Sequence, residues 1–207
     1  MNGVKFLDIV LFPRSLYKRI TSSKALLVPA IIFVGLNDML FQVAAQDFGI
    51  FKNKPGNILL LNIALFTAFT VIVGLVDILF FSLPMFDLFK LFKRGARTFS
   101  DSGLLIKLIK VYVVSHFLII PVEILITVVF KNPILSGNYT LVYFAGILGL
   151  FIPIWFSAAI TRGINVLYDF EPLHKVLAFV SVFVWNILLS YFAFDYMLNN
   201  WVMKVFM

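Results

Sequence analysis

The chain has 207 residues, of which 62% are hydrophobic and 13% are charged, and its mean hydropathy is +1.03. Soluble domains are only ~45–50% apolar, so this composition excludes an ordinary soluble protein and indicates an integral membrane protein. The lack of cysteine excludes disulfides, cysteine nucleophiles and thiolate metal sites. The formal charge of +7 lies beside apolar segments, so we expect anionic phospholipids rather than nucleic acid as partners.

Residues 1–24 form a basic cytoplasmic lead-in. Within residues 4–12, apolar side chains recur on one helical side while Lys5 and Asp8 lie on another, and Pro13 stops a helix. This pattern predicts a short interfacial helix lying on the membrane. A frayed tail is the alternative, because so short a helix is marginal in water.

Five apolar segments follow, each close to the ~20 residues that a helix needs to cross the hydrocarbon. They cover residues 25–45, 58–81, 108–130, 139–160 and 176–198. We therefore expect an all-α, polytopic membrane protein in which residues 25–207 form a single five-helix transmembrane domain.

The connection over residues 82–106 is amphipathic. Its polar side chains recur every three or four positions, and they are Asp87, Lys90, Lys93, Arg94 and Arg97. Apolar residues, many of them phenylalanine, cover the rest of the same helix. We expect this interfacial helix to lie in the headgroup layer on the cytoplasmic side, with the four basic side chains as headgroup contacts.

The distribution of basic residues predicts the topology. Of the 17 lysines and arginines, 13 fall on the side of the N-terminus when the five spans are counted off. The positive-inside rule therefore places the N-terminus in the cytoplasm and the C-terminus outside.

Ionisable residues inside the spans are the candidate site. Asp38 and Glu123 fall at similar depth, and two carboxylates that meet would need a shared proton or a cation. Asn37, His116 and Asn186 could complete such a polar site. The alternative is that each group is hydrogen-bonded between helices and serves packing.

Two further features of the spans have alternatives. His116 lies seven residues before Glu123, on one helical face, but no second ligand stands at metal-binding spacing, which favours a packing role and predicts no metal or cofactor. Asp77 and Arg162 have matching depth and could form a structural ion pair, or Arg162 could bind a lipid headgroup. Gly146 and Gly149 could allow two helices to approach closely.

Several stretches resemble the Ypt-interacting-protein (Yip-type) family of five-span membrane proteins. They are FPRSLYKRITSSKALLVPAI, RGARTFSDSGLLIKLIKVYVVSHFLIIPVEI with the mid-span Pro121, and LGLFIPIWFSAAITRGINVLYDFEPLHKVLAFVSV with Trp155, Arg162-Gly163 and Ala178. The likeness runs from about residue 12 to 194. The eukaryotic members carry a polar cytosolic N-terminal region that is almost absent here, which implies a prokaryotic member in the cell membrane.

The resemblance implies a non-enzymatic role in membrane organisation or trafficking, through lipid, through membrane-protein partners or through a homo-oligomer. No catalytic residues come with it, and no serine, histidine and acid stand in a hydrolase motif. The alternative is a small proton- or cation-linked transporter, or a lipid-translocating protein, that uses Asp38 and Glu123.

Overall fold

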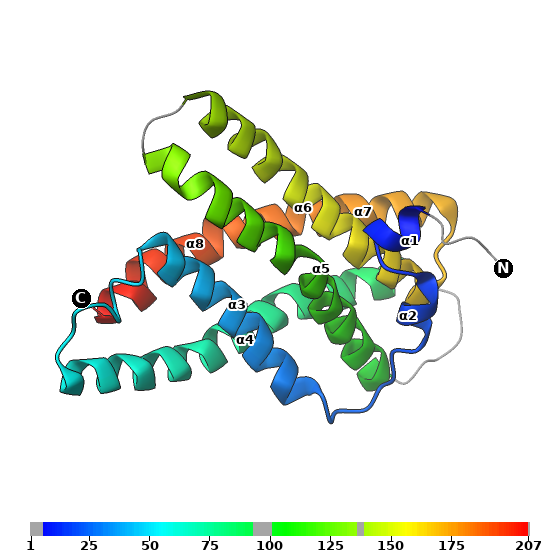
Figure 1. Cartoon of the computed structure of the whole chain (residues 1–207). Coiled ribbons are helices and arrows are strands. Elements are labelled where there is room, and N and C mark those ends of the chain that lie inside the picture. Colours follow the sequence, from blue (N-terminus) through cyan, green and yellow to red (C-terminus); the bar gives the residue numbers. More distant parts are fainter. Residues whose placement is uncertain (1–5, 93–100, 136–138, 207) are drawn as a thin grey trace. The chain divides into compact units, whose positions relative to one another are not determined.

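A computed structural model describes residues 6–92, 101–135 and 139–206 (Figure 1). These residues form helices and contain no strand. Five helices among them are long and apolar enough to cross a membrane. They are Leu27–Ala45 (α3), Gly56–Phe92 (α4), Gly103–Leu125 within Asp101–Leu135 (α5), Tyr139–Tyr168 (α6) and the run Pro172–Phe206. The predicted all-α, multi-pass architecture is confirmed.

The fifth span is longer than predicted. It begins with α7 (Pro172–Ile187) and continues through η1 (Leu188–Phe194), α8 (Asp195–Met197), η2 (Leu198–Val202) and η3 (Met203–Phe206). The turns of η1 and η2 are wider than those of an α-helix. The helix passes the predicted end at residue 198 because Val202, Met203 and Phe206 are buried and add apolar contacts.

The chain divides into two compact units. Unit 1 comprises Met1–Ser23 and Ser82–Asn186, and unit 2 comprises Lys24–Phe81 and Ile187–Met207. The single five-helix domain expected over residues 25–207 stays a prediction. Each unit joins segments that are far apart in the sequence.

The second span does not end before the amphipathic connection. Helix α4 continues through Pro84 to Phe92, whereas the sequence predicted a break near residue 82. A proline inside a helix removes one backbone hydrogen bond. The side chains of Met85, Phe86 and Phe89, which follow the proline, are buried and offset that loss.

The third span also begins earlier than predicted. Helix α5 starts at Asp101, before the predicted span of residues 108–130, and includes Lys107 and Lys110. Lys110 is compatible with a position inside the helix, because its ammonium donates a 2.9 Å hydrogen bond to the carbonyl oxygen of Thr21.

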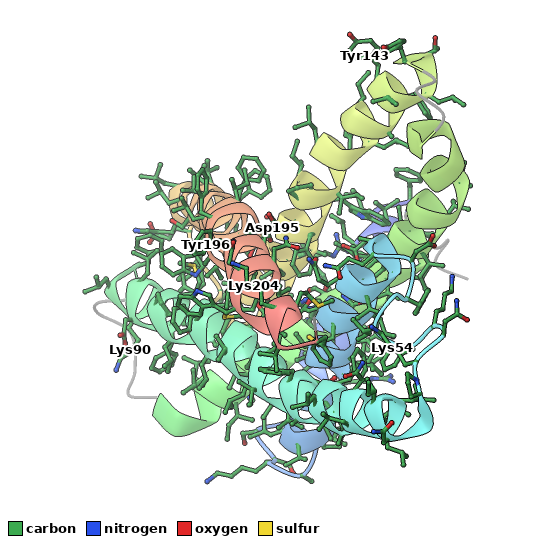
Figure 2. All side chains as sticks on the ribbon, turned by 90° about the vertical axis from the view of Figure 1, so that its left-hand side faces the viewer. Lys54, Lys90, Tyr143, Asp195, Tyr196 and Lys204 are labelled. Atoms are coloured by element: carbon green, nitrogen blue, oxygen red, sulfur yellow. The ribbon has the colours of Figure 1, made fainter. Side chains whose placement is uncertain are left out.

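In unit 1, α5 and α6 run side by side (Figures 1 and 2). The fully buried side chains between and around them include Leu108, Val111, Ile160 and Ile164. Two short helices precede the spans, α1 (Phe6–Val10) and α2 (Arg14–Lys18), and α2 packs on α6. The predicted helix before Pro13 is therefore present as α1.

In unit 2, α3 crosses α4 where two glycines meet (Figure 1). A Cβ atom built on Gly35 would lie 2.6 Å from the backbone nitrogen of Gly74, so neither position has room for a side chain. Such contact between backbones is typical of membrane helices that pack through small residues.

The close approach predicted at Gly146 and Gly149 is wrong for the described residues. A Cβ atom at either position meets nothing within 4 Å. Both glycines lie on a part of α6 whose large side chains, such as Leu150, are mostly exposed. The close crossing is instead formed by Gly35 and Gly74, one glycine from each of two spans.

Candidate functional site

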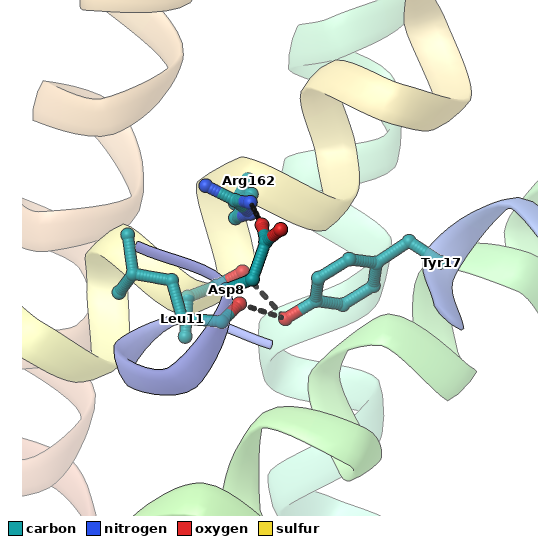
Figure 3. Close-up of polar contacts among 5 residues, drawn as sticks. Asp8, Leu11, Tyr17 and Arg162 are labelled. Atoms are coloured by element: carbon teal, nitrogen blue, oxygen red, sulfur yellow. Dashed lines mark hydrogen bonds and ion pairs between the residues drawn. The ribbon is translucent and has the colours of Figure 1, made fainter. Parts of the chain in front are cut away.

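Tyr17 holds the N-terminal segment, residues 6–23, against α6 (Figure 3). Its side chain is fully buried. Its hydroxyl oxygen lies 3.0 Å from the carbonyl oxygen of Ala159 and 3.3 Å from that of Leu11, so the single O–H hydrogen is shared between a carbonyl of α6 and one of its own segment. Burial raises the pKa of Tyr17 to about 12, because the phenolate would lose its hydration.

Two further contacts fix the same segment. Arg162 on α6 forms an ion pair with Asp8 on α1 (Figure 3), and both side chains are mostly shielded from solvent. The indole nitrogen of Trp155 donates a 2.6 Å hydrogen bond to the carbonyl oxygen of Val10. Because the partners lie on α6 and on α1, the contacts orient the short helix relative to the span.

Gly163 makes room for this docking. A Cβ atom on Gly163 would lie 2.8 Å from two carbons of the Tyr17 ring, which is closer than carbon atoms approach without a shift. The Arg162-Gly163 element therefore has two structural roles in one turn of α6. Arg162 pairs with Asp8, and Gly163 admits the Tyr17 ring.

The docked segment presents apolar and basic side chains together. Phe6, Leu7 and Ile9 are 76%, 54% and 66% exposed. Arg14, Lys18 and Arg19, a few residues later, are exposed as well. We call residues 6–19 the N-terminal surface.

An aromatic cluster anchors the end of α4 to the same region of unit 1. The ring of Phe89 lies 5.6 Å from that of Tyr168 and 5.8 Å from that of Phe170, and His174 lies 5.6 Å from Phe92. Tyr168 ends α6, and Phe170 and His174 lead into α7. The periodicity of single spans could not reveal this cluster, because it joins the end of α4 to residues 168–174, which are distant in sequence.

Lys90 is one of the four basic residues that the sequence predicts to contact lipid headgroups. It is exposed and points outward from α4 (Figure 2), with its ammonium 5.3 Å from the centroid of the Phe86 ring. The other three predicted headgroup contacts, Lys93, Arg94 and Arg97, lie outside the described residues.

The contacts of His116 fit a packing role. The residue is buried in α5, its Nδ1 atom lies 3.0 Å from the carbonyl oxygen of Tyr112, and its ring packs between Tyr112 and Phe156 at 4.6 and 4.8 Å. Within the described part of the chain, no group of three His, Cys, Asp or Glu side chains could hold a metal ion.

The remaining members of the predicted polar site fall in different units. Asn186 is buried in unit 1 and donates a 3.0 Å hydrogen bond to the hydroxyl of Ser157, which links α7 to α6. Glu123 is half-buried in unit 1, whereas Asn37 and Asp38 are half-buried in unit 2. A site that joins Asp38 to Glu123 therefore stays a prediction.

The predicted pair of Asp77 and Arg162 also draws on both units, with Asp77 buried in unit 2. It stays a prediction, while within unit 1 Arg162 pairs with Asp8. The sequence could not reveal this partner, because Asp8 lies on a helix outside the spans and has no depth to compare with that of Arg162.

The chain matches no protein-family model, no curated protein and no solved structure. Membership of the Yip-type family accordingly stays a prediction, and the functional argument depends on the geometry of unit 1.

Proposed function

We propose that this chain is a non-enzymatic multi-pass membrane protein of the Yip type, which organises the membrane by binding anionic phospholipids at its cytoplasmic face. The observation that supports the proposal most is the N-terminal surface. Its exposed phenylalanine, leucine and isoleucine stand beside three exposed basic residues on a segment that is fixed to a membrane-length helix.

This combination suits the headgroup layer. Exposed apolar side chains gain about 25 cal/mol for each Å² that leaves water, and a basic side chain near an anionic leaflet adds about 1 kcal/mol. A free segment of this length would lose conformational entropy on becoming helical, and this loss would weaken its binding. The contacts of Asp8 and Tyr17 with α6 support binding by a segment that is already ordered.

The distribution of charge supports the orientation that this proposal needs. The N-terminal surface and Lys90 belong to the side that carries 13 of the 17 basic residues when the spans are counted off. By the positive-inside rule this side faces the cytoplasm, whose leaflet is anionic. The membrane of a prokaryotic cell is the location that we propose.

The test measures which lipids surround the protein. Full-length protein is reconstituted into vesicles with trace spin-labelled phosphatidylserine or phosphatidylcholine, and electron spin resonance gives the fraction of each that the protein immobilises. We expect preference for phosphatidylserine, and a lower preference in the Arg19→Gln/Lys90→Gln variant, because two exposed cations are lost from the proposed face.

A matched control removes two exposed lysines from the side of the membrane that the predicted topology places opposite to the N-terminus. The Lys52→Gln/Lys54→Gln variant loses the same charge from the connection between α3 and α4. It should keep the preference of the wild type for phosphatidylserine in vesicles whose anionic lipid is confined to the leaflet facing the N-terminus. Equal losses in the two variants would contradict the proposal.

A further inference from the structure

Unit 1 contains a cavity of about 710 Å³ beside the N-terminal surface. It lies between the docked segment, the last turns of α6 and the beginning of α7. Its volume falls within the ~300–1,000 Å³ of cavities that hold small molecules. The docking of residues 6–23 forms one wall, so the cavity depends on the contacts of Tyr17 and Asp8 with α6.

The lining of the cavity is strongly basic. Arg14, Lys18, Arg162 and Lys175 contribute cationic side chains, and Asp169 contributes the one acid among the described lining residues. Arg162 is partly neutralised by Asp8, whereas Arg14, Lys18 and Lys175 are exposed along the rim. The excess of positive charge favours an anionic ligand.

Three residues that line the cavity also carry buried polar atoms without a hydrogen-bond partner among the described residues. Thr161 is only 4% exposed, and its hydroxyl finds no hydrogen-bond partner among the described residues. The Nε atom of Arg162 and the amide oxygen of Asn165 are also buried, and neither finds a hydrogen-bond partner in the part of the chain that the structure describes. Buried polar groups are nearly always hydrogen-bonded, so unsatisfied groups on three residues that line one cavity favour a polar ligand there.

The three atoms specify complementary chemistry. The Thr161 hydroxyl and the Arg162 Nε–H can donate to the oxygens of a phosphate, and arginine suits phosphate geometry particularly well. The Asn165 amide oxygen accepts, so it suits a hydroxyl or ammonium group next to that phosphate. An anion with both features is a phosphodiester headgroup.

The rest of the lining is apolar. Leu11, Val176 and Phe179 face the same space, and Val176 and Phe179 lie on a helix of membrane length. A soluble sugar phosphate would gain nothing from these side chains. A phospholipid would place its acyl chains along them while its phosphate remained among the basic residues.

We propose that this cavity binds the headgroup of one anionic phospholipid, with its phosphate between Thr161, Arg162 and Lys175. The inference rests on the proposed function, since it names a single bound lipid at the face where the protein meets the anionic leaflet. It adds a stoichiometric site to the general preference for anionic lipid.

The experiment titrates purified full-length protein in a non-ionic detergent with phosphatidylglycerol and counts bound lipids by native mass spectrometry. Phosphatidylcholine and inorganic phosphate serve as parallel titrants. We expect one phosphatidylglycerol to bind at least about tenfold more tightly than phosphatidylcholine, and inorganic phosphate at equal concentration not to displace it, because it lacks the acyl chains.

Two variants remove the proposed contacts with little change of shape. Thr161→Val deletes the buried hydroxyl, and Lys175→Gln deletes a charge at an exposed position where folding is not at stake. Each should raise the Kd for phosphatidylglycerol by about fivefold. The matched controls Thr67→Val and Lys52→Gln change residues outside the cavity lining and should leave the Kd unchanged.

The outcomes separate this site from the proposed function. Equal retention of phosphatidylcholine, displacement by inorganic phosphate, or an unchanged Kd in both cavity variants would overturn the site. A preference for spin-labelled phosphatidylserine that persists in that case would leave the proposed function standing. Failure of the proposed function would instead show as loss of that preference in the wild-type protein.

Discussion

At the scale of single residues, Tyr17 and Gly163 explain how a short N-terminal segment with apolar and basic side chains docks on a membrane-length helix. A tyrosine hydroxyl that is buried needs acceptors, and the carbonyl groups of Leu11 and Ala159 supply them. Helical carbonyls are accessible to such a donor only if the ring can come close. Gly163 permits this approach, since a Cβ atom there would overlap the ring.

The raised pKa of Tyr17 predicts a specific dependence of stability on pH. In the unfolded chain the phenol ionises near its ordinary pKa of about 10, while in the folded protein burial holds the pKa at about 12. The free energy of unfolding therefore gains no pH dependence from Tyr17 below pH 10. It falls between pH 10 and 12, by up to about 3 kcal/mol.

The measurement compares denaturant unfolding of wild-type protein and of Tyr17→Phe in detergent from pH 9 to pH 12. Other groups titrate in this range, but they do so in both proteins, so the difference isolates Tyr17. The two stability curves should converge as pH rises. Parallel curves would show that the phenol is not buried in the folded state.

The alternative function, proton- or cation-linked transport, would depend on the acidic residues within the spans. If Glu123 takes part in transport, Glu123→Gln should abolish a proton or cation flux that purified wild-type protein produces in vesicles, because the amide cannot release a proton. Asp195→Asn, an acid that lies on the exposed part of α8, is the matched control. The absence of flux in the wild type would rule out this alternative.

At the scale of helices, hydrophobic length was sufficient to predict all five spans, because a membrane requires a long apolar helix at each crossing. The helix ends were harder to predict. Pro84 and the pair Asn199-Asn200 both suggest termination, yet buried side chains beyond them extend the helices. Burial of this kind comes from tertiary contacts, which no local pattern contains.

The crossing of α3 and α4 provides a prediction at the same scale. Gly35→Ala adds a methyl group where the backbone of α4 already lies, so the helices must separate. We expect a loss of about 1–3 kcal/mol in the free energy of unfolding. Gly146→Ala is the control, because its Cβ atom meets nothing within 4 Å, and alanine favours a helix. Unfolding in mixed micelles measures both.

An equal effect of the two alanine substitutions, or a stabilisation by Gly35→Ala, would contradict the close crossing. The sequence pointed to Gly146 and Gly149, because both lie on one span with short spacing. Glycine content on a single helix does not reveal which glycine faces a neighbour. The pair that meets here comes from two helices, with one glycine from each.

At the scale of the whole molecule, the charge distribution predicts where each connection lies, and the lack of native cysteine allows a direct test. Single cysteines at exposed positions, Ser23→Cys and Asn57→Cys, report on opposite sides of the first span. In intact cells a membrane-impermeant thiol reagent should label Asn57→Cys, and it should label Ser23→Cys only after the membrane is opened. The reverse pattern would invert the topology.

The candidate site could be predicted only in part at this scale. The basic character of the N-terminal side follows from counting charges, and the position of Arg162 in the sequence marked it as a candidate for an ion pair or a headgroup contact. The ion pair with Asp8, the aromatic cluster around Phe89 and the cavity beside Thr161 did not, because each joins segments more than 50 residues apart. Pairings over that distance depend on the fold of unit 1 and leave no periodic signal.

The central claim, that the protein binds anionic lipid through exposed basic residues, is tested most directly by the salt dependence of lipid selectivity in the wild-type protein. Spin-labelled phosphatidylserine and phosphatidylcholine are compared in vesicles at about 0.1 M and 1 M salt, where the Debye length falls from about 10 to 3 Å. We predict a clear preference for phosphatidylserine at low salt that weakens at high salt. Equal immobilisation of the two lipids at low salt would contradict the account.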